Sequence, residues 1–286
     1  MSAQITSVGA HLSVAGGLSR CLQRGAEVGA EVAQVFLANP RAWASPPDDA
    51  DGDAAFESLR AERGIAVFVH APYLINFGSP SPDTLARSAA ALSFSLRRAA
   101  AIGASGVVMH AGSAVLGNDR DVAMAQVRNS LLRVLDVSGG PRLLIEPTAG
   151  GGGALASDAA SLAAYLQVIG PDERVGVCLD TCHMHAAGHD VSTPQLLASA
   201  VQDFARAAGN GRIGLVHAND SRDPVGSKRD RHAPIGAGTI GRDAFSSLFE
   251  TPVIRGVPLV VETADAEHAS DIATLKALRA AAATRR

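Results

Sequence analysis

The chain has 286 residues, of which 47% are hydrophobic, so it can bury a large core and is not a mainly disordered protein. Its 25 basic and 28 acidic residues give a formal net charge of −3, so the chain as a whole lacks the basic excess that marks most nucleic-acid binders. A polyanionic partner would therefore have to be held by a local patch or by bound metal.

The sequence also bears on compartment and redox state. It has no run of about 18 apolar residues, and its first residues lack the basic end and apolar stretch of a secretory signal. Its three cysteines, Cys21, Cys178 and Cys182, form no CxxC pair, which argues against a disulfide framework and against a thiolate zinc site. We therefore expect a cytoplasmic protein without a membrane partner.

Eight short apolar runs recur along the chain without polar alternation, as expected for parallel strands covered on both faces. They span residues 5–10, 32–37, 65–69, 106–109, 142–145, 175–179, 212–216 and 257–261. Segments of helical composition span 17–29, 53–63, 82–102, 120–137, 158–169, 194–207, 243–249 and 265–283. Several of these begin with Asp or Pro and end near Gly, which is typical of helix boundaries.

Eight strand–helix pairs give a repeat of about 36 residues, which suits a single (β/α)8 TIM barrel, an α/β fold. We therefore expect one domain over residues 1–286. Periodicity alone also allows a doubly wound open sheet, but no GxGxxG motif follows the first strand, so a dinucleotide-binding fold has no support.

Metal-ligating residue types follow six of the eight predicted strands. They are His70, His110, Glu146, Asp180, His217 and Glu262. Strands of a parallel barrel all point the same way, so these side chains should converge on the C-terminal face, where barrel enzymes keep their active sites. One such residue at a strand end is usually a solvated terminus, but six of eight indicate a site for several divalent metals.

Three more residues extend this set. His183 follows Asp180 by three positions in the DTCH motif, close enough to fold back over the barrel mouth. Asp230 and His232 lie two residues apart, so they face the same way on an extended segment. The nine residues are five histidines and four carboxylates, which suits Zn²⁺ or Mn²⁺ in hydrolytic chemistry. We expect the two cysteines that flank Asp180 to be small buried side chains instead of ligands.

These residues lie in stretches that resemble the endonuclease IV family (apurinic/apyrimidinic endonuclease family 2), nearly from end to end. The stretches are GAHLSVAGGL (9–18), FLANPRAW (36–43), HAPYLINF (70–77), EPTAGGG (146–152), GVCLDTCHMHAAGHD (176–190), HANDS (217–221), DRHAPIGAG (230–238) and ET (262–263). All nine ligand positions of the family carry the family's residue types here. The DTCH and DRH motifs together are highly specific.

The resemblance implies three divalent metals, with Zn²⁺ as the expected cofactor and Mn²⁺ as an alternative at one or more sites. The implied sets are His70, His110 and Glu146 for the first metal; Glu146 again, as a bridge, with Asp180, His217 and Glu262 for the second; and His183, Asp230 and His232 for the third. Glu146 and Glu262 are the implied catalytic residues, since two neighbouring metals can activate water and stabilise an in-line displacement.

The resemblance also implies the reaction and the partner. The reaction is hydrolysis of the DNA phosphodiester on the 5′ side of an abasic site, which leaves a 3′-hydroxyl and a 5′-deoxyribose phosphate. The same site would remove blocking groups from 3′ ends. We expect a monomer that acts on duplex DNA with abasic sites or blocked 3′ ends. Three divalent ions would change the formal charge to −3 + 6 = +3, so the metal-loaded protein could hold DNA although the chain itself lacks a basic excess.

Arg41, Tyr73 and Leu74 match family residues that enter the base stack or wedge into the duplex at the lesion. Such wedges are suited to this task because unstacking costs least where a base is already missing. Beside the third metal set lie Lys228, Arg229 and Arg231, which either add phosphate contacts or form a solvated loop. We expect Trp43 to be a packing residue.

Two departures from the family pattern lie beside ligands. Pro147 stands where the family usually has Asn, which removes a backbone donor and a side-chain amide, and the loop after His110 reads HAGS where HPG is more usual. Both should change the hydrogen bonds that orient Glu146 and His110. We expect them to affect the rate more than the type of reaction.

The main alternative is a single-metal sugar isomerase or epimerase on a related barrel. Such an enzyme also gathers Glu, Asp, His and Glu from strand ends, so the second set does not separate the two functions. The histidines of the first set and the whole third set do, because a single-metal isomerase has no use for two further sites. A non-catalytic DNA-damage binder would need a defective metal centre, and no ligand is missing here.

Overall fold

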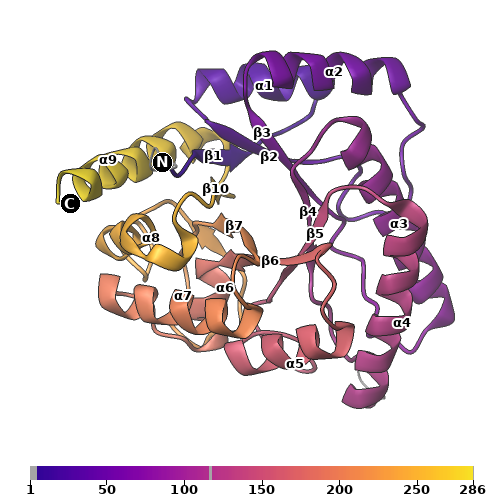
Figure 1. Cartoon of the computed structure of the whole chain (residues 1–286). Coiled ribbons are helices and arrows are strands. Elements are labelled where there is room, and N and C mark those ends of the chain that lie inside the picture. Colours follow the sequence, from indigo (N-terminus) through magenta and orange to yellow (C-terminus); the bar gives the residue numbers. More distant parts are fainter. Residues whose placement is uncertain (1–4, 116–117, 286) are drawn as a thin grey trace.

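The computed structural model describes residues 5–115 and 118–285, and in this part of the chain eight parallel strands close into a barrel surrounded by helices (Figure 1). In order around the barrel, the strands are β1 (Val8–His11), β2 (Val32–Phe36), β3 (Ala66–His70), β4 (Gly106–His110), β5 (Arg142–Glu146), β6 (Val175–Asp180), β7 (Ile213–His217) and β10 (Leu259–Val261). The ring closes because β10 pairs in parallel with both β1 and β7. The expected TIM-barrel fold is therefore confirmed. Residues 1–4, 116–117 and 286 of the expected domain lie outside the described residues.

The longer helices form the outer layer of the barrel (Figure 1). They are α1 (Leu18–Glu27), α2 (Ala50–Glu62), α3 (Pro82–Ala101), α4 (Arg120–Ser138), α5 (Ala159–Ile169), α7 (Pro194–Ala208) and α9 (His268–Thr284). Several start where the sequence predicts: the side chains of Ser81, Asp119, Asp158 and Thr193 each accept a hydrogen bond from the first turn of the helix that follows.

Three predicted helices differ from the structure, and the one expected at 265–283 is a 3-10 turn over Asp265–Glu267 followed by α9 from His268. The helix expected at 53–63 begins at Ala50, because Asp49 caps it by accepting the amide of Gly52. Asp53, the expected start, instead pairs with Arg98 on α3 at 2.9 Å. The helix expected at 243–249 is a 3-10 turn, Arg242–Ser246, followed by the short α8 (Ser247–Glu250).

The core has two parts. Inside the barrel, seven buried residues from the strands form an apolar plug: Val32, Phe68, Val108, Leu144, Cys178, Leu215 and Val260. A larger cluster fills the space between the strands and the surrounding helices. Both Cys178 and Cys182 are buried, as expected. The plug fills the barrel below the carboxyl ends of the strands, so polar side chains gather at its C-terminal mouth.

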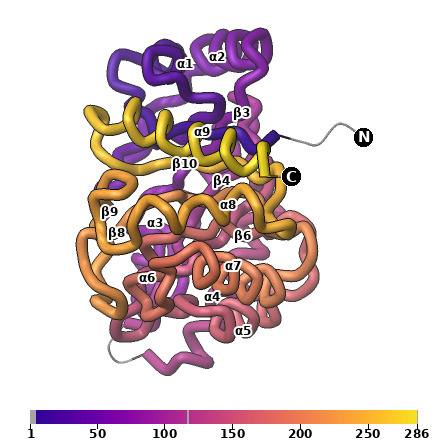
Figure 2. Tube along the Cα trace, turned by 90° about the vertical axis from the view of Figure 1, so that its left-hand side faces the viewer, coloured from indigo at the N-terminus to yellow at the C-terminus, as the bar shows by residue number. Residues whose placement is uncertain are grey.

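Three small elements lie at the same end of the barrel as the carboxyl ends of its strands. The strands β8 (Asp220–Ser221) and β9 (His232–Ala233) pair as an antiparallel hairpin, and α6 (Thr181–Ala187) directly follows β6. Figure 2 shows β8 and β9 side by side at one end of the molecule, opposite the C-terminal end of α9. They bring the DTCH and DRH motifs to one place.

The loop after β9 is held by one buried carboxylate. Asp220 accepts hydrogen bonds from the backbone amides of Gly236, Gly238 and Ile240, at 2.9, 3.2 and 2.9 Å. Its side chain is fully buried. Because a buried carboxylate needs such donors, the loop and β8 stabilise each other.

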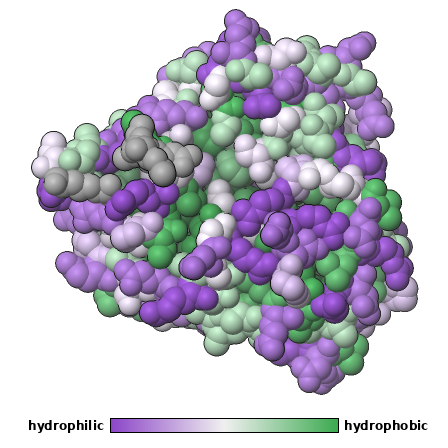
Figure 3. All heavy atoms as spheres, viewed as in Figure 1, coloured by the Kyte–Doolittle hydropathy of each residue, from purple (hydrophilic) through white to green (hydrophobic). Residues whose placement is uncertain are grey.

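The surface mixes residue types. Figure 3 shows hydrophilic and hydrophobic residues intermingled on the face seen in Figure 1, as is usual for the outside of a globular protein. Large exposed hydrophobic side chains, such as Val122, Leu196 and Val253, lie on different elements. Within residues 5–115 and 118–285, no helix combines the length and the apolar character needed to span a bilayer.

Candidate metal centre

The residues expected at the strand ends lie at the mouth of the barrel. The last residues of β3 to β7 are His70, His110, Glu146, Asp180 and His217, and Glu262 directly follows β10. Strand register aligns neighbours: His110 is opposite Glu146, and Asp180 is opposite His217. Regular parallel pairing therefore brings ligand types from separate parts of the chain to one level of the barrel.

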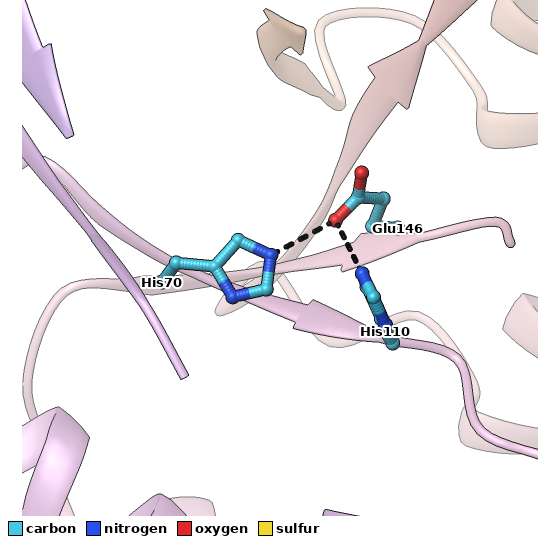
Figure 4. A group of neighbouring side chains, drawn as sticks. All are labelled: His70, His110 and Glu146. Carbon is cyan, nitrogen blue, oxygen red and sulfur yellow. Dashed lines mark hydrogen bonds and ion pairs between the residues drawn. The ribbon is translucent and has the colours of Figure 1, made fainter. Parts of the chain in front are cut away.

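The first set joins two imidazoles and one carboxylate oxygen (Figure 4). The Nε2 atoms of His70 and His110 lie 3.3 and 3.4 Å from Oε2 of Glu146. Nδ1 of His70 lies 2.7 Å from the carbonyl oxygen of Ala71, which only accepts, so Nδ1 carries a proton and Nε2 is the ring atom that faces Glu146. Burial lowers the pKa of His110 to about 4, so this ring is neutral at pH 7. Two imidazole nitrogens and a carboxylate oxygen that face one another at these distances are ligand types of a divalent metal such as Zn²⁺, so these residues fit a metal.

The second set surrounds one nitrogen with three carboxylates. Nδ1 of His217 lies 2.9 Å from Oε1 of Glu146, 3.2 Å from Oε2 of Glu262 and 3.8 Å from Oδ2 of Asp180. Burial raises the pKa of Asp180, although the positive charge of protonated His183 opposes this shift. So many negative charges in a buried space require compensation, which a divalent cation would supply.

The third set lies at the rim. Asp230 places Oδ2 3.1 Å from Nε2 of His183 and Oδ1 2.9 Å from Nε2 of His232. The other ring nitrogens lie near backbone carbonyls, at 3.0 Å from Pro147 and 3.3 Å from Glu262. Burial opposes protonation of His232, but the hydrogen bond to Asp230 and the charge of Asp180 raise its pKa to about 9. Both rings thus turn one nitrogen toward the same carboxylate.

All nine expected ligands fall into these three groups, and in each group the ligand atoms lie within 4.8 Å of one another. Glu146 lies between the first and second sets, because its Oε2 faces the first set and its Oε1 faces the second. The thiol of Cys178 also lies near Glu146 and His217. Burial raises its pKa to about 12, and the side chain belongs to the apolar plug, so that Cys178 is not a ligand remains our prediction.

The sequence analysis missed three polar side chains that contact this centre. Asn219 donates from Nδ2 to Asp180 at 2.7 Å and to Glu262 at 3.1 Å, and its Oδ1 accepts the amide of Glu262. Gln34 is buried in β2 beside Glu262. His11 ends β1, one residue beyond the predicted end of that strand, and its Nε2 is buried without a partner among the described residues. The signals in the sequence were Gln34, the one polar residue of the apolar run VAQVFL, and Asn219 within the ligand-bearing motif HANDS.

A cavity of about 420 Å³ adjoins the second and third sets, and its lining includes His11, Tyr73, His232 and Glu262. The ring of Tyr73 stacks on His110, with centroids 5.4 Å apart, and 45% of the residue is exposed. Tyr73 therefore packs against the first set and still presents surface to an incoming ligand.

The other residues with an expected DNA role lie on nearby loops. The amide of Tyr73 donates to the carbonyl of Pro40 at 3.0 Å, which joins the loop that carries Arg41 to the loop that carries Tyr73 and Leu74. Arg41 is exposed, and its side chain makes no hydrogen bond or ion pair with the described residues. Leu74 is half-buried.

The basic segment 227–231 is partly engaged within the protein. Arg231 forms a two-fold hydrogen bond with the carboxylate of Asp223, and Arg229 lies 3.7 Å from the same carboxylate. Nζ of Lys228 donates to the carbonyl of Ala187 at 2.6 Å. The side chains of Arg229 and Arg231 remain 66% and 54% exposed, so both still present guanidinium surface, and their contact with phosphate stays a prediction.

The two departures from the family pattern are compatible with ordered ligands. The carbonyl of Pro147 accepts the Nδ1–H of His183 at 3.0 Å, a bond that needs neither an amide hydrogen nor an amide side chain. Ala111 donates its amide to the carbonyl of Glu146 at 2.9 Å, which a proline at this position could not do. The chain therefore retains backbone hydrogen bonds beside both residues.

Comparisons with known proteins agree with this geometry. A family model described as "Xylose isomerase-like TIM barrel" matches residues 22–283. The chain is 47% identical over 278 residues to a "Probable endonuclease 4" of Streptomyces coelicolor, with 95% of each chain covered. The crystal structure of endonuclease IV from Thermus thermophilus superposes with a TM-score of 0.83 at 32% identity, covering 95% of this chain and 98% of that one. A D-tagatose 3-epimerase-like protein has a TM-score of 0.78 at 18% identity, covering 98% and 99%, and this likeness shows the fold alone.

Proposed function

The chain belongs to the endonuclease IV family, and from this premise we propose that it hydrolyses the phosphodiester on the 5′ side of abasic sites in duplex DNA. The products would be a 3′-hydroxyl and a 5′-deoxyribose phosphate, and the same site would clear blocked 3′ ends. The observation that carries the proposal is the convergence of nine ligand-type residues into three groups whose ligand atoms lie within 4.8 Å.

The proposal assigns three Zn²⁺ ions to these groups, with Mn²⁺ as the alternative. The first metal would be held by His70, His110 and Glu146, the second by Glu146, Asp180, His217 and Glu262, and the third by His183, Asp230 and His232. When bound, neighbouring divalent metals lower the pKa of water and stabilise charge that develops on a phosphate during displacement. Glu146 is suited to bridging because each of its oxygens faces a different set.

The other residues would bind and orient the substrate. Glu262 lines the cavity of about 420 Å³, so it is placed to accept a proton from a water molecule there, and Asn219 holds its carboxylate. Arg41, Tyr73 and Leu74 lie on two loops joined by a backbone hydrogen bond, which would bring them to the duplex as one unit. An abasic site favours such contacts because no base has to be unstacked there.

A single-metal sugar isomerase or epimerase is not favoured. The epimerase-like neighbour shares the fold at 18% identity, whereas the relative at 47% identity is named a probable endonuclease. The first and third sets add His70, His110, His183, Asp230 and His232 to the residues that such an isomerase would use.

Metal analysis and a cleavage assay on the purified protein test the proposal. We expect close to three zinc ions per chain, incision of a duplex with one abasic site, no incision of the undamaged duplex, and loss of activity after chelation. Light scattering should give a monomer, since we also propose that residues 1–286 act as one domain. One metal per chain together with sugar isomerisation and intact abasic DNA would overturn the proposal.

A further inference from the structure

Gln34 is a buried polar side chain in the middle of an apolar strand, and its amide lies between three residues of the mouth. Its Nε2 is 2.7 Å from Oε1 of Glu262 and 2.9 Å from Nδ1 of His11. Its Oε1 is 2.9 Å from Nε2 of His217. All three are hydrogen-bond distances, so both ends of this amide are used.

The chemistry of the partners fixes the direction of each bond. A carboxylate only accepts, so the amide nitrogen of Gln34 faces Glu262 and the amide oxygen faces His217. An amide oxygen also only accepts, so Nε2 of His217 carries a proton. The lone pair of the neutral ring is then on Nδ1, the atom that lies 2.9 Å from Glu146.

The second hydrogen of the Gln34 amide nitrogen determines which ring nitrogen of His11 carries the proton. One hydrogen goes to Glu262 and the other to Nδ1 of His11 at 2.9 Å, so Nδ1 accepts and the proton of His11 is on Nε2. The competing contact, from Nδ1 of His11 to Glu262, is longer at 3.4 Å.

Gln34 accepts a hydrogen bond from the outer ring nitrogen of His217, as backbone carbonyls do for other histidines of the centre. The outer ring nitrogens of His70, His183 and His232 lie near carbonyl oxygens of Ala71, Pro147 and Glu262. For His217 the partner is a side chain from another strand, 183 positions away in the sequence. It can therefore be changed without altering the backbone.

We propose that Gln34 is a positioning residue of the second metal set, which fixes the tautomer of His217 that leaves Nδ1 free for metal and holds Glu262 against it. Outer hydrogen bonds of this kind orient the ligand ring and raise its affinity for metal. This inference rests on the proposed metal role of the second set.

The test compares two variants. Gln34→Met keeps the length of the side chain and removes its hydrogen bonds, while Gln126→Met removes a half-buried amide on α4 that bonds Asn118 and Ser79. For Gln34→Met we expect weaker binding of one zinc ion by about 10–100-fold in competition with a chromophoric chelator. For Gln126→Met we expect no change. Equal zinc affinity in folded Gln34→Met and the wild type would overturn the inference.

NMR spectra of histidine-labelled protein give a readout that does not depend on activity. In the zinc-loaded wild type, we expect His217 to keep a slowly exchanging proton on Nε2, which should exchange faster in Gln34→Met. In the metal-free wild type, we expect the proton of neutral His11 on Nε2. A His217 that binds metal through Nε2, or a His11 protonated on Nδ1, would overturn the inference.

The wild-type spectra keep the inference testable even if Gln34→Met does not fold. They also separate the two proposals. A wild type that binds no zinc contradicts the proposed function, and the position of the His11 proton then still decides whether Gln34 donates as inferred.

Discussion

Asp230→Ala and His232→Ala, combined in one variant, should empty the third metal set and leave the other two loaded. The inner nitrogens of the two histidines of this set lie 3.1 and 2.9 Å from the Asp230 carboxylate, so the double change leaves only His183. The first and second sets use neither residue. We therefore expect about two zinc ions per chain in place of three.

The expected loss of activity is large and the expected loss of stability is moderate. Removing a group that stabilises charge developing in the transition state costs about 10²–10³-fold in rate, or about 2.7–4 kcal/mol. The Asp230 side chain is 44% exposed, but its partners His183 and His232 are only 5% and 17% exposed, so loss of these ion pairs should cost about 1–3 kcal/mol of folding free energy, more than loss of a fully exposed pair. For a chain of this size, 1 kcal/mol corresponds to a change in Tm of about 2–4 °C.

Elemental analysis, thermal unfolding and single-turnover cleavage of an abasic duplex measure the three quantities. Asp243→Ala is a matched control, because Asp243 is highly exposed and lies outside the three sets. It should keep the wild-type zinc content and rate. Three zinc ions and an unchanged rate in the double variant would refute the assignment of the third set.

Four further predictions concern single residues. Glu262→Gln keeps the side-chain volume but removes a negative charge from the second set, so the cleavage rate should fall by orders of magnitude while circular dichroism stays unchanged. Tyr73→Ala and Arg41→Ala should each weaken binding of abasic duplex and retain all metal, and loss of the Tyr73 aromatic contact should cost about 1–3 kcal/mol. Anisotropy titrations measure the DNA affinity, and elemental analysis measures the metal content. Loss of metal from Tyr73→Ala would instead assign Tyr73 to packing. In the metal-free protein, the pKa of His232 is raised from 6.5 to about 9. The stabilisation from protonated His232 is therefore complete below pH 6.5 and is lost as the pH rises through about 9. The difference in unfolding free energy between the wild type and His232→Gln should shrink over this pH range. Asp220→Ala leaves five backbone amides without this acceptor, those of Ser221, Gly236, Gly238, Ile240 and Gly241, so urea unfolding should show a loss of about 3 kcal/mol or more.

The barrel and most of the centre could be predicted because the pattern of a parallel barrel is regular. Each apolar run marks a strand buried on both faces, and the residue after it must lie at the mouth. The sixth run, 175–179, corresponds to β6, Val175–Asp180, and Asp180 lies at the mouth as expected. The fold was therefore predictable from spacing, and the ligand types from their position relative to each strand end.

The segment after Asp180 was harder to predict. His183 was expected to fold back over the mouth, and it does so as part of a helix, α6, that Asp180 itself caps by accepting the amide of His183 at 2.7 Å. Seven residues are too few for a helical period to be visible in the sequence. One oxygen of Asp180 thus caps the helix while the other faces His217.

The hydrogen bonds that surround the ligands could not be predicted at all. Gln34 reaches His217 across 183 positions, and Asn219 reaches Glu262 across 43. Such contacts depend on which side chains point into the barrel at the same level, and that is set by strand register. A polar residue inside the run VAQVFL shows that something unusual is buried there, but not which partner it meets.

The position of β10 has a consequence for the order in which the protein is made. This strand lies between β1 and β7, yet it is the last strand of the barrel to leave the ribosome. Until Leu259–Val261 emerges, both neighbours keep an unpaired edge, which is a hazard for aggregation. Glu262, the last of the nine clustered residues, follows at once. Synthesis therefore closes the barrel, protects two edges and brings in the final carboxylate in a single late step.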